Sequence, residues 1–164
     1  QFDASAGVPG LMPSFPESVL IHCVRPVLVL PRVYHFNALP SHALIAWDGS
    51  ENATRAITGA LPLLKRADKV RLAIFNPAER SDAHGAQPGA DMALYLSRQG
   101  VRVDVMVRET RIDAGEALLS LCADEGADLL VMGAFGHTRF RELLLGGATR
   151  HVLDAMTLPV LMAH

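Results

Sequence analysis

The sequence has little cysteine, no long apolar run and no excess of charge of one sign. Its two cysteines, Cys23 and Cys122, are too few and too far apart for a disulfide framework, so we expect a reducing, cytoplasmic location. The longest apolar stretch, 19–30, is interrupted by histidine, arginine and proline and is shorter than the roughly 20 residues of a membrane-spanning helix. The 15 basic and 17 acidic side chains are well mixed, which argues against a nucleic-acid or membrane partner.

Motifs that mark common enzyme sites are also missing. The sequence contains no Gly-x-Ser-x-Gly elbow, no Gly-x4-Gly-Lys-Ser/Thr phosphate loop and no His-Glu-x-x-His zinc motif. The residues His35, His42, Asp82 and His84 lack the spacing of metal ligands, so we expect no metal site. A binding protein is therefore favoured over a dedicated enzyme. Cys122 lies on an apolar helix face and is expected to be an unreactive core residue.

Residues 41–164 instead show a regular alternation of short apolar runs and helical patterns. Strands are predicted at 43–47, 70–74, 101–107, 129–132 and 159–162. Helices are predicted between them at 53–64, 91–99, 114–125 and 147–156, with Ser50 and Asp113 as N-caps. This alternation predicts an α/β fold, an open five-stranded parallel sheet with helices on both faces.

The 101–107 segment has the strictest alternation. Its valines alternate with Arg102, Asp104 and Met106, which is typical of a strand with one drier and one wetter face. We expect such a strand at a sheet edge. Pro62, inside the 53–64 helix, is expected to shorten or kink it.

The first forty residues contain a partial repeat of the end of the sequence. Residues 19–20 match 152–153, and 26–28 match 159–161, both at an offset of 133 positions. We interpret 1–31 as the last helix and strand of a preceding domain, 32–40 as a linker and 41–164 as a complete domain. An unrelated N-terminal arm is the alternative. The absence of a starting methionine favours truncation.

Glycines that follow a strand end and open the last helix form the strongest candidate site. Gly133 and Gly136 follow the 129–132 strand, and Gly146 and Gly147 begin the final helix. Ligands of open parallel sheets bind beyond the carboxyl ends of strands, where the strand order reverses. A helix N-terminus attracts anions. The pattern therefore predicts contacts to a ribose or phosphate, with Thr149 adding a hydroxyl group.

The motif resembles that of a known family. Gly133-x2-Gly136, nine residues and then Gly146 resemble the nucleotide-binding motif Gly-x2-Gly-x9-Gly-Ser/Thr of the universal stress protein family. The resemblance covers about 41–164 and includes Asp48-Gly49-Ser50 after the first strand. It implies a Rossmann-like sheet with strand order 3-2-1-4-5. Many members are tandem two-domain chains, which implies the C-terminal part of such a chain.

The resemblance also implies a ligand, ATP or another adenine nucleotide, with or without Mg²⁺. An Asp after the first strand contacts the adenine or ribose in members that bind ATP, and here this is Asp48. The nucleotide-binding residues expected are Asp48, Met132, Gly133, Gly136, His137, Gly146, Gly147, Ala148 and Thr149. Gly147 stands where the family has Ser or Thr. Losing that hydroxyl donor weakens binding by about 1.5–3 kcal/mol, and Thr149 is a candidate to replace it.

Together these features predict a universal stress protein that binds a nucleotide and acts as a stress-response module. Slow ATP hydrolysis stays open, although the sequence holds no dedicated machinery for it. The alternative is a structural dimerisation or interaction module of the same fold that has lost its ligand. The resemblance implies pairing of the edge strand Pro159–Met162 with a partner domain of the same family or in a homodimer. Pro26–Leu30 is the candidate partner within the chain.

Overall fold

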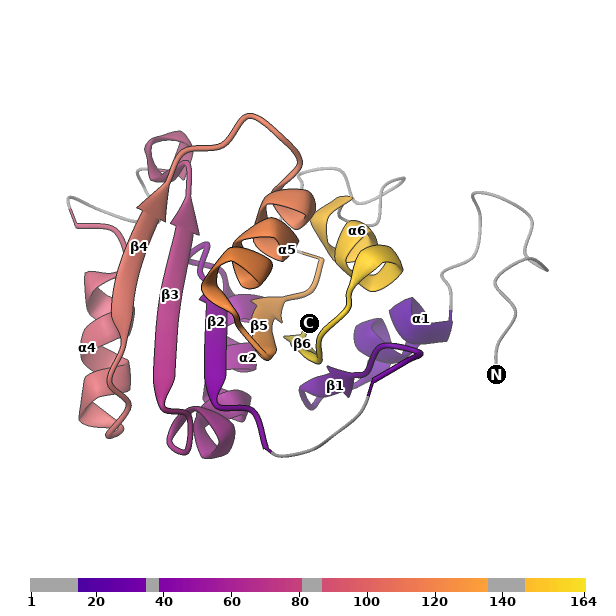
Figure 1. Ribbon diagram of the computed structural model, residues 1–164, viewed down its shortest axis with the longest axis horizontal. Coiled ribbons are helices and arrows are strands. Elements are labelled where there is room, and N and C mark those ends of the chain that lie inside the picture. The colour runs from indigo at the N-terminus through magenta and orange to yellow at the C-terminus, as the bar shows by residue number, and fades with distance from the viewer. Residues whose placement is uncertain (1–14, 35–38, 81–86, 136–146) are drawn as a thin grey trace.

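A single sheet flanked by helices organises the chain in a computed structural model that describes residues 15–34, 39–80, 87–135 and 147–164. Its strands are β1 (Val27–Val29), β2 (His42–Ala46), β3 (Lys69–Phe75), β4 (Asp104–Arg108), β5 (Leu129–Gly133) and β6 (Val160–Ala163). Its helices are α1 (Phe15–His22), α2 (Glu51–Leu64), the 3-10 helix η1 (Pro77–Arg80), α4 (Ala90–Arg98), α5 (Ala114–Glu125) and α6 (Gly147–Ala155) (Figure 1). Strands and helices alternate from β2 onward, which confirms the predicted α/β fold.

The sheet has six strands in the order β1-β6-β5-β2-β3-β4, so the prediction of five strands is wrong by one. The strands β2 to β6 are parallel to one another and follow the predicted order, and β1 extends that order at one edge. It pairs antiparallel with β6, Leu28 opposite Leu161. The edge of β6 would otherwise present unpaired backbone groups, which an adjacent extended segment can satisfy. The expected pairing of 26–30 with 159–162 is therefore confirmed.

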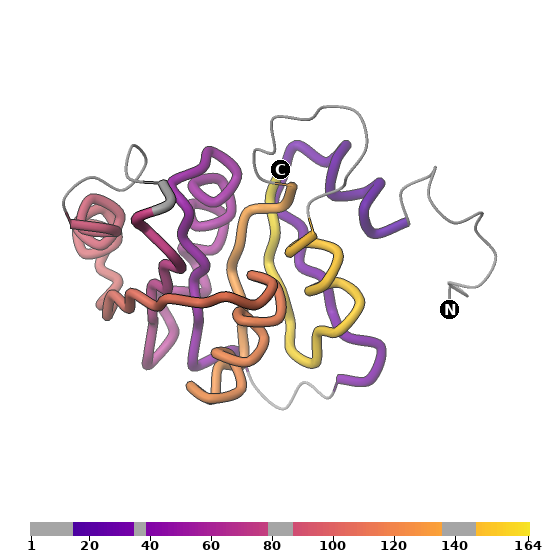
Figure 2. The backbone as a smooth tube through the Cα atoms, turned by 90° about the horizontal axis from the view of Figure 1, so that it is seen from above, coloured from indigo at the N-terminus to yellow at the C-terminus, as the bar shows by residue number. Residues whose placement is uncertain are grey.

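Two hydrophobic clusters fill the space between the sheet and its helices. On one face, α2 and α4 bury residues such as Ile57 and Leu96 against β2, β3 and β5. On the other face, α5 and α6 bury residues such as Leu118 and Val152 against the same strands and β6. Figure 2 shows α5 and α6 on the side of the sheet opposite α2. The chain thus has the predicted helix cover on both faces.

Side-chain caps begin two of the helices at the predicted residues. The hydroxyl of Ser50 accepts a hydrogen bond of 3.1 Å from the Ala53 amide at the start of α2. The carboxylate of Asp113 accepts one of 2.8 Å from the Gly115 amide at the start of α5. Such caps satisfy amide groups that lack a partner within the helix. Helix α2 runs past Pro62 to Leu64, so the proline does not cut it short.

Strand β4 is an edge strand, as predicted, but its faces differ from the prediction. Met106 is buried in the cluster beneath α5, whereas Val105 and Val107 are 41% and 44% exposed. The strand begins at Asp104, and of the preceding valines Val101 is buried and Val103 packs beside it. The alternation predicts the presence of the strand, but packing against the helices decides which of its faces is buried.

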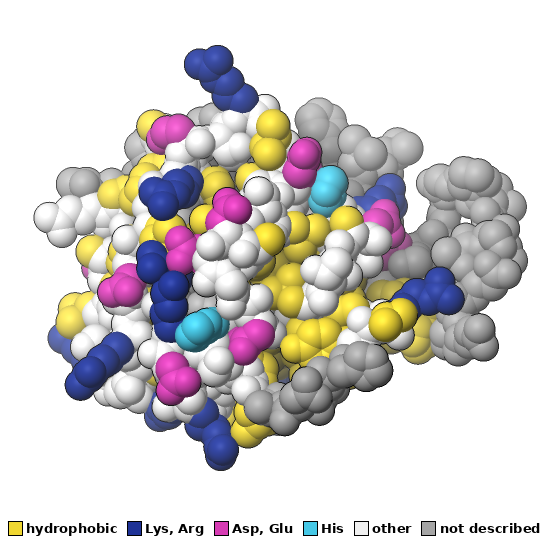
Figure 3. Space-filling model, in the orientation of Figure 1, with side chains coloured by type: hydrophobic (Ala, Val, Ile, Leu, Met, Phe, Trp, Pro, Cys, Tyr) yellow, Lys and Arg dark blue, Asp and Glu magenta, His cyan; other side chains and the backbone are white. Residues whose placement is uncertain are grey.

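Charged side chains of both signs are interspersed over the face drawn in Figure 3, and hydrophobic side chains gather right of its centre. Within the described ranges, no helix is long and apolar enough to cross a bilayer. In the same ranges, no three His, Cys, Asp or Glu side chains come together as a metal site.

Candidate functional site

The predicted site lies where the strand order reverses, between β2 and β5. These central strands pair in parallel, with Ile45 opposite Val131. From β2 the sheet continues through β3 and β4 to one edge, and from β5 through β6 and β1 to the other. Asp48 and Ala134 each lie three residues beyond the paired Ile45 and Val131, so both stand just past the carboxyl ends of adjacent strands. This is the position at which open α/β sheets bind their ligands.

Asp48 shapes the turn that leads from β2 into α2. Its carboxylate accepts a hydrogen bond of 3.0 Å from the Ser50 amide, and its side chain is half-buried. Ser50 in turn caps α2, so the two side chains together place the helix N-terminus at the end of β2. Asp48 therefore has a structural role whether or not it also contacts a ligand.

Gly133, the last residue of β5, packs directly against the start of α2. A Cβ at this position would lie 2.7 Å from the Ala53 amide nitrogen and 3.1 Å from the Asn52 carbonyl carbon. Neither backbone atom can move without shifting the capped first turn of the helix. Glycine is therefore required here by the close approach of helix and strand, independently of a ligand.

The segment after β5 is held in an unusual conformation by α6. Phe135 has a φ of 53°, in the left-handed region that residues other than glycine rarely adopt. Its amide donates a hydrogen bond of 3.0 Å to the hydroxyl of Thr149, a buried residue in the first turn of α6. Backbone strain of this kind costs on the order of 1–3 kcal/mol and clusters at functional sites.

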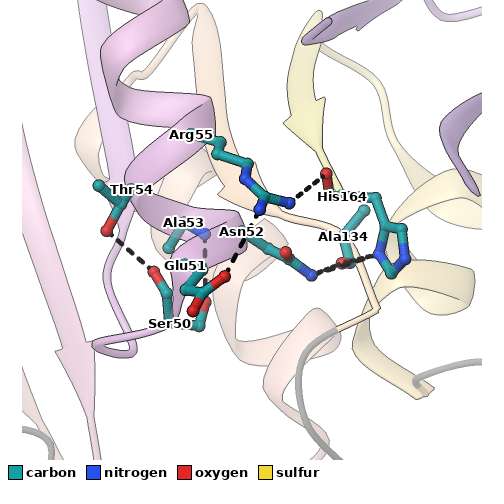
Figure 4. Close-up of polar contacts among 8 residues, drawn as sticks. All are labelled: Ser50, Glu51, Asn52, Ala53, Thr54, Arg55, Ala134 and His164. Atoms are coloured by element: carbon teal, nitrogen blue, oxygen red, sulfur yellow. Dashed lines mark hydrogen bonds and ion pairs between the residues drawn. The ribbon is translucent and has the colours of Figure 1, made fainter. Parts of the chain in front are cut away.

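A polar cluster that sequence reasoning missed closes the same end of the sheet (Figure 4). The side-chain amide of Asn52 donates a hydrogen bond of 2.8 Å to the Ala134 carbonyl and lies 3.3 Å from Nδ1 of His164. Arg55, one turn later in α2, donates one of 3.1 Å to the His164 carbonyl. The ring of Phe135 meets the His164 imidazole edge-on, with centroids 5.8 Å apart. The cluster thus joins α2, the end of β6 and the segment after β5.

A second missed contact links the ends of the outer strands. Asn76, directly after β3, donates a side-chain hydrogen bond of 2.9 Å to the Thr110 carbonyl. It also accepts one of 2.8 Å from the Thr110 amide. Asn76 itself has a φ of 46°. The sequence offered two signals for these contacts. One is an Asn directly after a strand, and the other is the pair of polar residues Asn52 and Arg55 in the first turns of a capped helix. Neither signal shows which distant residue the side chain contacts.

The other predicted site residues divide into three groups. Met132 has its side chain in the core beneath α5 and α6, so only its backbone is available to a ligand. Gly147 and Ala148 form the start of α6, and a Cβ on Gly147 would make an ordinary 3.6 Å contact with Asp113. Gly136, His137 and Gly146 lie outside the described residues.

Two groups with shifted pKa values lie away from the switch point. Burial raises the pKa of the Cys122 thiol to about 12, which agrees with the predicted unreactive core residue. The hydrogen bond from Lys69 lowers the pKa of Glu125, and the positive charge of Arg71 acts in the same direction. Glu125 ends α5 and lies 3.1 Å from Lys69 Nζ and 3.0 Å from Arg71 Nε, both on β3. These contacts stabilise the fold and take no part in the site.

Comparison with known proteins reveals one family. The model of the universal stress protein family matches residues 41–164. Universal stress protein Slr1230 of Synechocystis is 27% identical over 145 residues, which cover 88% of this chain and 49% of that protein. The chain therefore spans about half the length of this relative.

Solved structures show the same fold. A universal stress protein from Archaeoglobus fulgidus superposes with a TM-score of 0.71 at 22% identity, over 93% of this chain and 56% of that one. A universal stress protein solved in complex with cAMP gives a TM-score of 0.53 at 22% identity, over 77% of this chain and 98% of that one. The structural matches establish a Rossmann-like α/β fold. Because the family model matches more than half of the chain, the chain belongs to the universal stress protein family.

Proposed function

We propose that the chain binds an adenine nucleotide beyond the carboxyl ends of β2 and β5 and acts as a stress-response regulatory module. The observation that carries the proposal is the strained backbone of Phe135, which Thr149 holds in place at the point where the strand order reverses. A simple connection from strand to helix would need no left-handed phenylalanine. A backbone fixed in this way at a strand end needs no further ordering when a ligand binds.

The residues present suit the parts of a nucleotide. Asp48, half-buried at the end of β2, is an acceptor for ribose hydroxyl or adenine amino groups. The N-terminus of α6 at Gly147 offers amide groups to the phosphates. The amides of Ala134 and Phe135 instead donate to the Ala163 carbonyl and the Thr149 hydroxyl. The Thr149 hydroxyl accepts a hydrogen bond from Phe135, so in this proposal it holds the loop and leaves phosphate contacts to the helix N-terminus.

The likeness to a universal stress protein in complex with cAMP supports the ligand class, because cAMP contains adenine, ribose and phosphate. We propose ATP, ADP, AMP or a cyclic relative as the ligand, with or without Mg²⁺. We propose no dedicated catalytic activity, since the sequence lacks the common hydrolase and phosphate-loop motifs. Slow ATP hydrolysis would be a side reaction of a bound nucleotide.

A second candidate, a ligand-free interaction module, is favoured by two other observations. Gly133 is required by its packing against α2, so its presence does not by itself indicate a ligand. Gly147 replaces the Ser or Thr of the family motif and removes one phosphate donor. In this alternative the chain would act only through surfaces such as the β1 and β6 edge.

The test compares nucleotide binding by the unmodified chain and two variants. We expect the purified chain to carry or bind an adenine nucleotide, measured by mass spectrometry of the released ligand and by calorimetry. Asp48→Asn keeps the oxygen that accepts from Ser50 but loses the charge, so its affinity should fall about tenfold with little change in Tm. The matched control is Asp104→Asn, on the exposed start of β4.

Two outcomes would decide against nucleotide binding. If millimolar ATP, ADP, AMP and cAMP leave the Tm unchanged and no nucleotide co-purifies, the interaction module becomes the better reading. If the affinities of the Asp48 and Asp104 variants fall equally, the ligand lies elsewhere. Phosphate release from ATP by the unmodified chain, measured beside a sample without protein, tests the proposed lack of dedicated hydrolysis.

A further inference from the structure

The N-terminal helix and strand match the last helix and strand of the chain in their boundaries. Helix α1 ends at His22 and α6 ends at Ala155, which is 133 positions later. Strand β1 begins at Val27 and β6 at Val160, at the same offset. Leu20 and Val152, from α1 and α6, belong to one hydrophobic cluster and so lie on the same face of the sheet. The two helix–strand units therefore correspond residue by residue.

The pairing of β1 with β6 is symmetric with respect to this correspondence. Leu28 lies opposite Leu161, its own equivalent. Val27 lies opposite Met162, the equivalent of Val29, and Val29 lies opposite Val160, the equivalent of Val27. A local two-fold axis through the Leu28–Leu161 pair thus exchanges the two strands. Every antiparallel register of two equivalent strands has such an axis, and in this register it passes through a pair of equivalent residues.

An ion pair between the helices obeys the same symmetry. Glu17 Oε1 of α1 lies 3.3 Å from Arg150 Nε of α6, and these residues are again 133 positions apart. Equivalent residues can touch only close to a two-fold axis, so this pair marks the axis at the level of the helices. The Glu17 carboxylate is buried, with only 4% of the residue exposed. Its charge therefore matters more than that of a surface residue.

The two units differ in how well they are covered. Leu161 is 7% exposed, whereas its equivalent Leu28 is 45% exposed. Val152 is fully buried, whereas its equivalent Val19 is only half-buried. In the C-terminal unit, β5 and α2 cover Leu161, and α5 covers Val152. Among the described residues, the side of β1 facing away from β6 thus has the sequence, but not the neighbouring strand, of an interior strand.

We propose that, where 15–30 and 147–163 meet about this two-fold axis, the Glu17–Arg150 pair selects unlike partners over identical ones. Two copies of the β6–α6 edge would place Arg150 against Arg150 on the axis. Two copies of the α1–β1 edge would place Glu17 against Glu17. Only the unlike combination brings opposite charges together, and like charges at an interface disfavour the wrong partner. This inference does not depend on nucleotide binding.

The first experiment is a charge-swap cycle in the full chain, read by hydrogen exchange of the β1 amides. Glu17→Arg and Arg150→Glu each place like charges on the axis and should speed exchange about tenfold, whereas the double swap should restore protection. Arg25→Glu is the control matched to Arg150→Glu, because it makes the same charge change in the exposed turn before β1. It should leave the exchange of the β1 amides unchanged. A double swap as unprotected as the single variants, or a control that behaves like them, would overturn the proposal.

The second experiment tests selection between chains by sedimentation. The Glu17→Arg variant carries arginine at both axial positions, and the Arg150→Glu variant carries glutamate at both. Each alone should remain monomeric, whereas an equimolar mixture should form a 1:1 heterodimer in which every axial contact joins opposite charges. A mixture that stays monomeric, or single variants that self-associate as strongly as the mixture, would show that the pair does not select the partner.

Discussion

The side-chain amide of Asn52, in the first turn of α2, donates a hydrogen bond to the backbone carbonyl of Ala134, the residue after β5, over 2.8 Å. The contact spans the point where the strand order reverses and fixes the backbone just before the strained Phe135. The candidate site is therefore held in shape by a side chain that does not belong to the glycine motif.

Removing this contact should weaken both the fold and the site. Asn52→Ala leaves the Ala134 carbonyl without this donor, so we expect the free energy of unfolding to fall by about 1 kcal/mol in urea denaturation. Nucleotide affinity should fall as well. Thr58→Ala, which removes a hydroxyl from an exposed position of the same helix, is the control and should change neither quantity appreciably. Equal effects of both variants would contradict the role given to Asn52.

Gly133 and Gly147 should respond oppositely to the same added methyl group. In Gly133→Ala the new Cβ would lie 2.7 Å from the Ala53 amide nitrogen, and we expect a loss of about 1–3 kcal/mol in stability. In Gly147→Ala the Cβ would lie 3.6 Å from Asp113, an ordinary contact, and alanine favours the helix. Urea denaturation of both variants tests this difference, and a neutral Gly133→Ala would refute the packing requirement.

Restoring the family residue at position 147 should improve nucleotide binding. The space beside Gly147 admits a side chain, so Gly147→Ser adds a hydroxyl donor at the start of α6 without a clash. We expect the Kd to fall about tenfold, the effect of one hydrogen bond to a charged group. Calorimetry with ATP measures it, and Gly147→Ala separates the hydroxyl from the added carbon. An unchanged Kd in the serine variant would place the phosphates away from this residue.

Glu125 should make stability depend on acid pH. Its pKa in the folded chain is lowered by the Lys69 hydrogen bond and the Arg71 charge below the ordinary value of 4.5. A lowered folded pKa gives stability that is present above the unfolded pKa and is lost as pH falls through the folded value. Glu125→Gln should therefore be less stable than the unmodified chain near pH 7, and the difference should shrink below pH 4.5. A difference in unfolding free energy that does not change with pH would contradict this.

The two cysteines should differ in reactivity. Burial raises the pKa of Cys122 to about 12, so almost none of it is thiolate at pH 8. Cys23, just after α1, is only half-buried. We expect a maleimide reagent to label Cys23 in the native chain and Cys122 only in urea, as peptide mass spectrometry can show. Native labelling of both residues at the same rate would be inconsistent with this burial.

Much of the fold could be predicted because its signals are local. Ser50 and Asp113 identify helix starts through their own side chains, and the apolar runs of β2 and β5 identify buried strands without knowledge of their neighbours. The pairing of β1 with β6 was accessible for another reason, since the repeated Pro-Val-Leu supplied long-range information within one sequence. Local rules and a repeat together define most of the sheet.

Contacts between distant residues account for what the sequence did not reveal. Met106 is the buried residue of β4 because the space beneath α5 accepts it, and no pattern within 101–107 records where α5 lies. The bond from Asn52 to Ala134 likewise joins residues 82 positions apart. Gly133 fits the glycine motif, yet the close approach of α2 explains it equally well. The sequence therefore identifies such a glycine as part of a motif, but it does not show whether packing or a ligand requires it.

The position of β6 between β5 and β1 also has a consequence for biosynthesis. Its four residues, Val160–Ala163, are all buried and pair with β5 on one side and β1 on the other. During translation, β1 emerges early but must wait for a partner encoded more than a hundred codons later. Contacts so distant in sequence form slowly. Leu20, which the folded chain buries against residues of α6 and β6, is therefore what a nascent chain would present to a chaperone until residue 163 leaves the ribosome.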